Sequence, residues 1–188
     1  MTPGEVFKVF LLLLVAAAAY AGLRLLQVKR KPQPQPELVR KLFHICGGVL
    51  ALSLPWLFDR ITPVLVLGAA VAAALVALRL VPQLRSGLGQ VLFGVERQSV
   101  GELCYLASIC LLFGLAGNDK LLYSVPLLIL TFADTFAALV GEQYGKLRLN
   151  MGGDRKSYEG TLAFFLAAFF CVHVPVLLWG GAERLESL

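Results

Sequence analysis

Six long apolar stretches constrain this chain more than any other feature of its sequence. A helix needs about 20 largely apolar residues to span the hydrocarbon core of a bilayer, and stretches of nearly this length recur along the whole chain. The chain has 188 residues, 58% of them hydrophobic, and a mean hydropathy of +0.76, so it is more apolar than a typical soluble domain. We therefore predict an all-α fold, a polytopic transmembrane helical bundle of about six spans. The predicted spans are Val6–Val28, Leu42–Phe58, Ile61–Leu80, Val100–Ala116, Leu121–Val140 and Thr161–Trp179.

Residues next to the first two spans predict where the second helix begins and whether the first is a membrane anchor. The second apolar run is short, and Pro36 and Glu37 offer a natural helix start before it, since proline and a carboxylate both suit a first turn. The first run resembles a signal peptide only in position. Its basic residues follow it and no small-residue cleavage site closes it, so we expect a retained membrane anchor.

The basic residues predict the orientation of the chain in the membrane. The chain has 17 Lys and Arg residues. Only four of them lie on the side of the membrane that holds the start of span one and the connections after spans two, four and six: Lys8, Arg60, Lys120 and Arg184. The positive-inside rule therefore places the N-terminus and the C-terminus outside and the other connections in the cytoplasm. Nucleic-acid binding does not fit this basicity, because the charges flank apolar spans. The remaining basic residues are Arg24, Lys29, Arg30, Lys31, Arg40, Lys41, Arg79, Arg85, Arg97, Lys146, Arg148, Arg155 and Lys156.

Asp134 is the clearest candidate for chemistry, because an ionisable residue within a span is costly and is a functional hypothesis by default. Ala138 and Gly141 follow it by four and seven residues and so share its helical face, and Gly145 extends this small-residue stripe. The stripe would let a ligand or another backbone approach the carboxylate. Two alternatives are a structural carboxylate bonded to a neighbouring helix and ordinary small-residue packing between membrane helices.

The loop at residues 142–160, EQYGKLRLNMGGDRKSYEG, combines glycines with basic residues and runs directly into the sixth span. Ser157 is expected to cap that span's helix, whose N-terminus would attract anions. The combination suits a metal-bound polyphosphate: Asp134 would hold Mg²⁺, and the basic residues would neutralise the transferring phosphoryl group. A positive-inside loop with a capped helix is the alternative. No Walker A pattern occurs, so a P-loop enzyme is excluded.

A third group of polar residues lies in ELVRKLFHICGG, residues 37–48. Arg40 and His44 are four residues apart on one helix face, with Lys41 beside them. Arg40 and Lys41 alone would be topology determinants or headgroup contacts. Glu102 adds a charge at the start of the fourth span, where a simple carboxylate at a helix start is the alternative.

These motifs resemble those of the CTP-dependent lipid-alcohol kinases, a family that includes phytol kinase, dolichol kinase and a CTP-using diacylglycerol kinase. The resemblance covers roughly residues 37–165 and rests on three motifs in order. RKxxH…G is matched by Arg40, Lys41, His44 and Gly48; ADxxAxxxGxxxGK by Ala133, Asp134, Ala137, Gly141, Gly145 and Lys146; KSxEG by Lys156, Ser157, Glu159 and Gly160.

The resemblance implies transfer of the γ-phosphoryl group of CTP to the hydroxyl of a long-chain lipid alcohol. It implies an integral, multi-pass membrane protein whose active site lies on the cytoplasmic face, with Mg²⁺ as cofactor and CTP as donor. A membrane lipid alcohol would be the substrate, and the tail would stay in the lipid bilayer. The implied catalytic residues are Asp134, also the metal ligand, His44, Lys156 and Glu159, and the implied nucleotide-binding residues are Arg40, Lys41, Gly141, Gly145, Lys146, Arg155, Ser157 and Gly160.

Two other functions stay open at this point. The phosphatidate cytidylyltransferases share a similar Asp…GxxxGK…K[ST]xEG segment and would make a CDP-lipid, but the RKxxH motif favours the kinases and the long cytidylyltransferase signature is missing. A transporter or membrane scaffold is the alternative from another class. Against it stands the one-sided distribution of polar residues, because a transport path should be polar near the midplane.

The organisation of the chain is predicted to be simple. Alternating prolines in KRKPQPQP, residues 29–36, favour an extended polyproline spacer. We expect an N-terminal anchor and spacer at residues 1–36 and a membrane-embedded helical domain that carries the site at residues 37–188. The cysteines, which lie inside predicted spans, are expected to be packing residues: Cys46, Cys104, Cys110 and Cys171.

Overall fold

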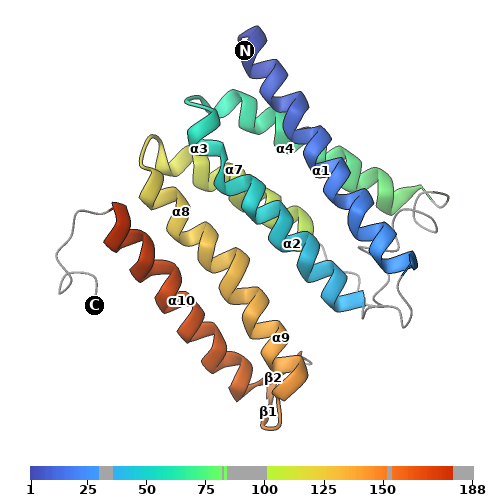
Figure 1. Ribbon diagram of the computed structural model, residues 1–188, viewed down its shortest axis with the longest axis vertical. Coiled ribbons are helices and arrows are strands. Elements are labelled where there is room, and N and C mark those ends of the chain that lie inside the picture. Colours follow the sequence, from blue (N-terminus) through green and yellow to red (C-terminus); the bar gives the residue numbers. More distant parts are fainter. Residues whose placement is uncertain (30–35, 82, 84–100, 152–153, 180–188) are drawn as a thin grey trace. The chain divides into compact units, whose positions relative to one another are not determined.

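The described part of the protein is almost entirely helical (Figure 1). The structure, a computed structural model, describes residues 1–29, 36–81, 83, 101–151 and 154–179. It divides into two units, Met1–Asn118 and Asp119–Leu188, each with its own packing. The first unit contains α1 (Pro3–Lys29), α2 (Pro36–Leu52), α3 (Leu54–Leu57), α4 (Ile61–Leu80) and α7 (Gly101–Ala116). The second contains α8 (Lys120–Leu128), a π-helical turn η1 (Ile129–Ala133), α9 (Asp134–Tyr144), β1 (Arg148–Met151), β2 (Asp154–Ser157) and α10 (Tyr158–Trp179).

Five helical segments of the described ranges are long and apolar enough to cross a membrane, by length and composition. α7, which corresponds to the fourth predicted span, is a shorter apolar helix of 16 residues. The all-α prediction is therefore confirmed, whereas the number of spans and the orientation of the termini stay predictions. The five segments are Pro3–Leu26, Leu38–Leu57, Ile61–Leu80, Lys120–Tyr144 and Tyr158–Leu178.

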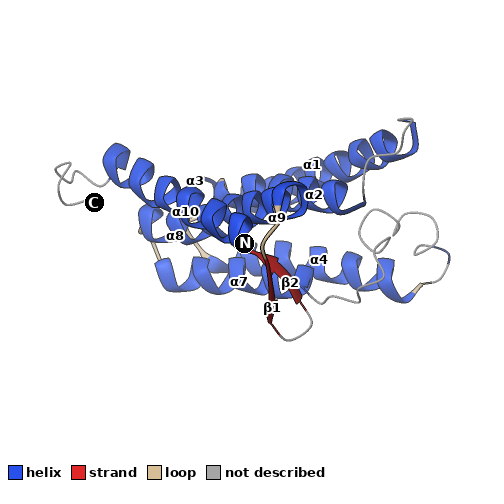
Figure 2. Ribbon diagram, turned by 90° about the horizontal axis from the view of Figure 1, so that it is seen from below, coloured by secondary structure: helices blue, strands red, loops and turns tan. Residues whose placement is uncertain are grey.

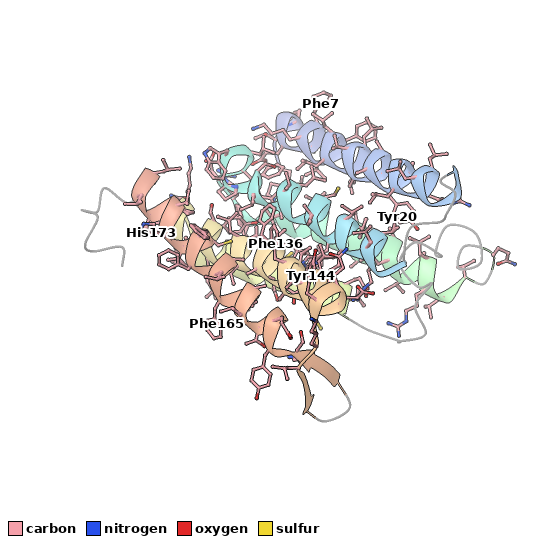
Figure 3. The ribbon with its side chains drawn as sticks, turned by 60° about the horizontal axis from the view of Figure 1, so that its bottom comes forward. Phe7, Tyr20, Phe136, Tyr144, Phe165 and His173 are labelled. Atoms are coloured by element: carbon pink, nitrogen blue, oxygen red, sulfur yellow. The ribbon has the colours of Figure 1, made fainter. Side chains whose placement is uncertain are left out.

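Large apolar side chains are exposed along α1 and α10. Phe7 and Phe10 on α1 are 65% and 62% exposed, and Phe165 on α10 is 66% exposed. Figure 3 shows Phe7 and Phe165 projecting from their helices. Exposure of this extent is costly in water and is expected where hydrocarbon is the solvent, so it supports a membrane protein.

In the first unit, α1 packs against α2 and α4. The rings of Tyr20 on α1 and Phe43 on α2 meet edge to face, with centroids 5.7 Å apart, next to buried Leu23 and Val39. Lys8 Nζ donates a hydrogen bond of 2.9 Å to the carbonyl of Leu57 at the end of α3. α1 thus makes specific contacts within its unit, and the organisational boundary at residue 36 stays a prediction.

Small residues let α4 and α7 approach each other closely. A Cβ built on Gly68 of α4 would lie 2.7 Å from Cys110 Sγ, and one on Gly114 of α7 would lie 2.9 Å from Ile61 Cδ1. Glycine at both positions therefore removes a steric barrier to helix contact. Cys110 is a packing residue here, as expected.

The second predicted span begins where expected but is interrupted. α2 starts at Pro36, as the proline predicted, and ends at Leu52. A separate short helix, α3, follows, with Pro55 in its first turn. Proline has no backbone N–H and its ring collides with the carbonyl four residues earlier, so a continuous helix from Leu42 to Phe58 is disfavoured.

In the second unit, α10 runs back alongside α8, η1 and α9 (Figure 1). The β1–β2 hairpin connects the end of α9 to the start of α10 and projects from these helix ends (Figure 2). Its strands are antiparallel, with Arg148 opposite Ser157 and Met151 opposite Asp154. The loop prediction did not include these strands. Each has only four residues, too few for a period-two pattern to stand out.

A π-helical turn precedes Asp134. The backbone N–H of Asp134 bonds to the carbonyl of Ile129, five residues earlier, and Pro126 lies inside α8 upstream. The buried Thr135 donates its hydroxyl to the carbonyl of buried Thr131, at 2.7 Å. An extra residue in a helical turn rotates the later part of the helix by about 100° relative to an uninterrupted α-helix. The π turn therefore determines which side of the helix carries Asp134.

Candidate functional site

Ser157 forms the N-cap of α10, as the sequence predicted. Its Oγ accepts a hydrogen bond of 3.1 Å from the backbone N–H of Gly160, and its carbonyl accepts one of 3.0 Å from the hydroxyl of Thr161. The side chain is buried. Capping satisfies one of the free N–H groups at the start of a helix and fixes where the helix begins. Binding of nucleotide by Ser157 stays a prediction beside this capping role.

Three glycines lie where the end of α9 meets the start of α10. A Cβ built on Gly160 would lie 2.7 Å from the carbonyl oxygen of Ala137 and 3.1 Å from Gly141 Cα, and one on Gly141 would lie 3.0 Å from Ser157 Oγ. Close packing of two helices, one of the alternatives for this stripe, thus accounts for glycine at positions 141 and 160. A Cβ on Gly145 would instead collide with the carbonyl of Gly141 in its own segment and lie 2.8 Å from Ser157 Oγ. Nucleotide contacts by the same glycines stay a prediction.

Glu159 ties the start of α10 to the segment that follows α9. Its Oε1 accepts hydrogen bonds from the backbone N–H groups of Lys146, at 3.0 Å, and Leu147, at 3.3 Å. The N–H of Tyr158 in turn donates to the carbonyl of Leu147, at 3.1 Å. The other carboxylate oxygen, Oε2, has less than 1 Å² of accessible surface and no hydrogen-bond partner among the described residues. The carboxylate therefore closes the base of the hairpin.

Asp134 is exposed and is the first residue of α9. Because α9 rises 1.5 Å per residue, Asp134 lies about 10 Å along the helix from Gly141, which contacts the capped start of α10. Ala137 lies opposite Gly160, the third residue of α10, so Asp134 is about one turn further along the helix pair than Gly160. The carboxylate and the α10 N-terminus thus lie at different levels of one helix pair.

The basic residues of this region lie near the hairpin. Lys146 and Lys156 are exposed, the first directly after the end of α9 and the second next to the α10 cap. Arg155 lies in β2, where its backbone is opposite Asn150. Its side chain lies outside the described part of the structure, so its role in binding nucleotide stays a prediction.

The RKxxH residues lie on α2 in the first unit. Arg40, Lys41 and His44 are all partly buried. The His44 ring packs against the ring of Tyr105 on α7, with centroids 4.1 Å apart and planes inclined by 41°. This contact fixes the imidazole by packing. Sequence reasoning did not single out Tyr105, because an aromatic residue inside an apolar span gives no signal of its own.

The structure thus gathers the predicted residues into two groups. The second unit holds Ser157, Glu159 and the three glycines together, with Asp134 further along the same helix pair. The first unit holds the α2 residues beside Tyr105 and the partly buried Glu102, both on α7. A site that combines the two groups stays a prediction.

Asp134 is the predicted ligand of a hard divalent cation. Among the described residues, no three His, Cys, Asp or Glu side chains gather in a cluster. Mg²⁺ commonly takes only one or two carboxylates and completes its shell with waters and substrate phosphates. A single exposed carboxylate is compatible with that mode of binding, and the metal itself stays a prediction.

The chain is similar to two curated phytol kinases. It is 34% identical over 163 residues to phytol kinase from Synechocystis sp., a match that covers 81% of this chain and 66% of that protein. It is 29% identical over 169 residues to a Triticum aestivum protein named "Probable phytol kinase, chloroplastic", covering 84% of this chain and 55% of that protein. The chain therefore spans just under two thirds of the first relative and about half of the second. These similarities support a lipid-alcohol kinase family, while no protein-family profile and no solved structure matches the chain.

Proposed function

We propose that this protein is a membrane-embedded kinase that transfers the γ-phosphoryl group of CTP to the hydroxyl of phytol or a related isoprenoid alcohol. The observation that carries this proposal is the 34% identity to a phytol kinase over 81% of the chain. The matched length is large enough to include helices of both units. The choice of phytol or a related alcohol rests on the names of the two relatives, and the choice of CTP rests on the resemblance of the three motifs.

The second unit supports a role in holding the nucleotide phosphates. The N-terminus of α10 carries a partial positive charge, and exposed Lys146 and Lys156 lie at the same end of the helix pair. Anionic phosphate oxygens would be attracted to all three. Asp134 would hold Mg²⁺, which when bound supplies further neutralisation of phosphate charge.

The alcohol is expected to reach the site from the bilayer. The exposed apolar side chains along α1 and α10 suit contact with lipid, and a long isoprenoid tail would remain among such chains. Only the hydroxyl would have to reach the polar end of the helices. There its oxygen attacks the γ-phosphorus, the bond between that phosphorus and the β–γ bridging oxygen breaks, and CDP leaves.

His44 is proposed to assist the hydroxyl or a phosphate. If it acts as the base, a ring nitrogen takes the hydroxyl proton as the new P–O bond forms. If it only orients a phosphate, the proton passes to solvent. Both roles need an imidazole held in one orientation, and the Tyr105 contact supports that requirement.

The test uses purified protein in detergent with Mg²⁺ and CTP labelled on the γ-phosphate. Phytol, geranylgeraniol, a polyprenol and diacylglycerol are offered separately, and unlabelled ATP or CTP is added as competitor. Label in a lipid phosphate, reduced by CTP and not by ATP, is the expected result. Release of pyrophosphate on addition of phosphatidate, without labelled lipid, would reassign the protein to cytidylyl transfer. Folded protein that is silent in both assays would contradict an enzymatic function and favour a transporter or scaffold.

A further inference from the structure

We propose that Glu159 is a positioning residue that fixes the base of the β1–β2 hairpin, and with it Lys146, and that it does not itself touch nucleotide or metal. The proposal rests on the proposed function, because the benefit of fixing Lys146 is its contact with a nucleotide phosphate. It reassigns the role that the KSxEG resemblance implied for this carboxylate. The contacts of its two oxygens carry the reassignment.

The first oxygen is fully engaged with backbone. Oε1 accepts from the N–H groups of Lys146 and Leu147, at 3.0 and 3.3 Å. The hydrogen bond from Tyr158 N–H to the Leu147 carbonyl, at 3.1 Å, runs in the opposite direction between the same two segments. Hydrogen bonds to an ionised acceptor are about twice as strong as neutral ones, which strengthens the two bonds to Oε1. We call these three hydrogen bonds the clamp.

The second oxygen is inaccessible to solvent. Oε2 has less than 1 Å² of accessible surface and no hydrogen-bond partner among the residues that the structure describes. An oxygen that binds a metal ion or a phosphate-bound proton must be reachable from the site. A carboxylate with one oxygen occupied by backbone and the other enclosed is instead suited to holding the protein itself.

The segment that Glu159 holds carries Lys146. This lysine directly follows Gly145, which is the C-cap of α9 and lies against Gly141 and Ser157. With the N–H of Lys146 and Leu147 also fixed, the lysine backbone is constrained from both sides while its side chain stays exposed. Although lysine has a flexible stem, fixing its backbone restricts its ammonium group to the region within reach of that one anchor point.

The test compares Glu159→Gln, Glu159→Asp and Glu159→Ala in steady-state kinetics with the nucleotide concentration varied. Glutamine keeps an Oε1 acceptor at the same reach without charge, whereas aspartate keeps the charge but is one methylene too short. A positioning role predicts that Gln restores activity to within about threefold of the parent protein. Ala and Asp should raise KM for the nucleotide about tenfold, because both hydrogen bonds to Oε1 are lost, with a smaller change in kcat. The proposal would be overturned if Glu159→Asp kept its activity while Glu159→Gln lost kcat, because the negative charge would then matter more than the hydrogen bonds.

Hydrogen exchange of the parent protein and the three variants in lipid nanodiscs gives a readout that needs no enzyme activity. The amides of Lys146 and Leu147 should exchange at least about tenfold faster in Glu159→Ala and be protected again in Glu159→Gln. Glu142→Ala, which removes an exposed carboxylate from the neighbouring α9, should change neither exchange nor kinetics. Unchanged exchange in Glu159→Ala would refute the clamp. If the Lys146 and Leu147 amides exchange across the variants as predicted but the parent protein has no kinase activity, the clamp is established and the proposed function is wrong.

Discussion

The backbones of Gly141 and Gly160 are in contact, so close that a Cβ built on Gly160 would lie 3.1 Å from Gly141 Cα. This contact joins α9 to the first turn of α10 next to the Ser157 cap. The hairpin is inserted between the two helices at the same level. A change in the separation of α9 and α10 would therefore also disturb the Ser157 cap and the base of the hairpin.

Gly160→Ala is expected to destabilise the second unit. The added methyl group would meet the carbonyl oxygen of Ala137 at 2.7 Å, which is backbone and cannot move aside alone. Overpacking of this kind typically costs about 1–3 kcal/mol, which thermal unfolding in detergent would detect as a lower midpoint. Gly47→Ala is the matched control, since a Cβ on Gly47 of α2 meets nothing within 4 Å. Equal midpoints for the two variants would contradict the close contact.

Ser157→Ala should lose more stability than Ser157→Gly. Alanine removes the cap acceptor for the Gly160 N–H and costs about 1 kcal/mol, whereas glycine at an N-cap costs only a few tenths. The measurement is thermal unfolding of both variants beside the parent protein. If glycine were the more damaging change, the side chain would be acting by packing and not through its capping hydrogen bond.

Asp134→Asn is expected to keep the fold and lose the reaction. The side chain is exposed, so an amide of equal size fits, but it is a poor ligand for a hard cation. Phosphoryl transfer should fall by at least about 100-fold, with an unchanged unfolding midpoint. Asp59→Asn, at an exposed carboxylate between α3 and α4, is the control and should retain full activity. Activity near that of the control would remove Asp134 from the site.

Removal of divalent cations should stop the same reaction. Nucleotide polyphosphates are used by kinases as their Mg²⁺ complexes, and the oxygen donors of the Asp134 carboxylate suit that cation. Excess EDTA is expected to abolish label transfer to lipid, and added Mg²⁺ to restore it. Transfer that continues in EDTA at an undiminished rate would exclude the cation from the mechanism.

His44→Phe tests whether the imidazole does more than pack. Phenylalanine can keep the ring contact with Tyr105 but has no nitrogen, so stability should be kept while activity falls by about 100-fold or more. His173→Phe is a matched control, because His173 also lies against an aromatic ring, that of Phe169 at 5.1 Å, but outside the predicted site. A His44→Phe protein as active as the control would reduce His44 to a packing residue.

The helical elements followed from the sequence because lipid imposes a simple requirement on length and polarity. Ile61–Leu80 was predicted to the residue, and the helix starts at Pro36 and after Ser157 followed from proline and capping chemistry. The π turn before Asp134 did not follow, because an i→i−5 bond leaves no mark in hydrophobic periodicity. The break before α3 was missed although Pro55 marks it, since the apolar run continues through it.

The sequence indicated which residues of the second unit lie close together better than it indicated what each of them does. Glycine spacing correctly indicated a close approach along the Asp134 face, and the structure shows another backbone there, from Gly160. The sequence alone could not distinguish contact with another backbone from contact with a ligand, because each kind of contact requires a residue without a side chain. In the same way, a glutamate in a basic loop suggests chemistry, and only its hydrogen bonds to Lys146 and Leu147 reveal the clamp.

The closed base of the hairpin has a practical consequence for labelling this protein. The Leu147–Tyr158 and Lys146–Glu159 hydrogen bonds secure the two ends of the connection independently of the residues between Met151 and Asp154. A short epitope or a fluorophore-binding peptide placed between those two residues would therefore leave the helix pair intact. Such a tag would mark one face of the membrane, and its accessibility from either side would report the orientation of the chain directly.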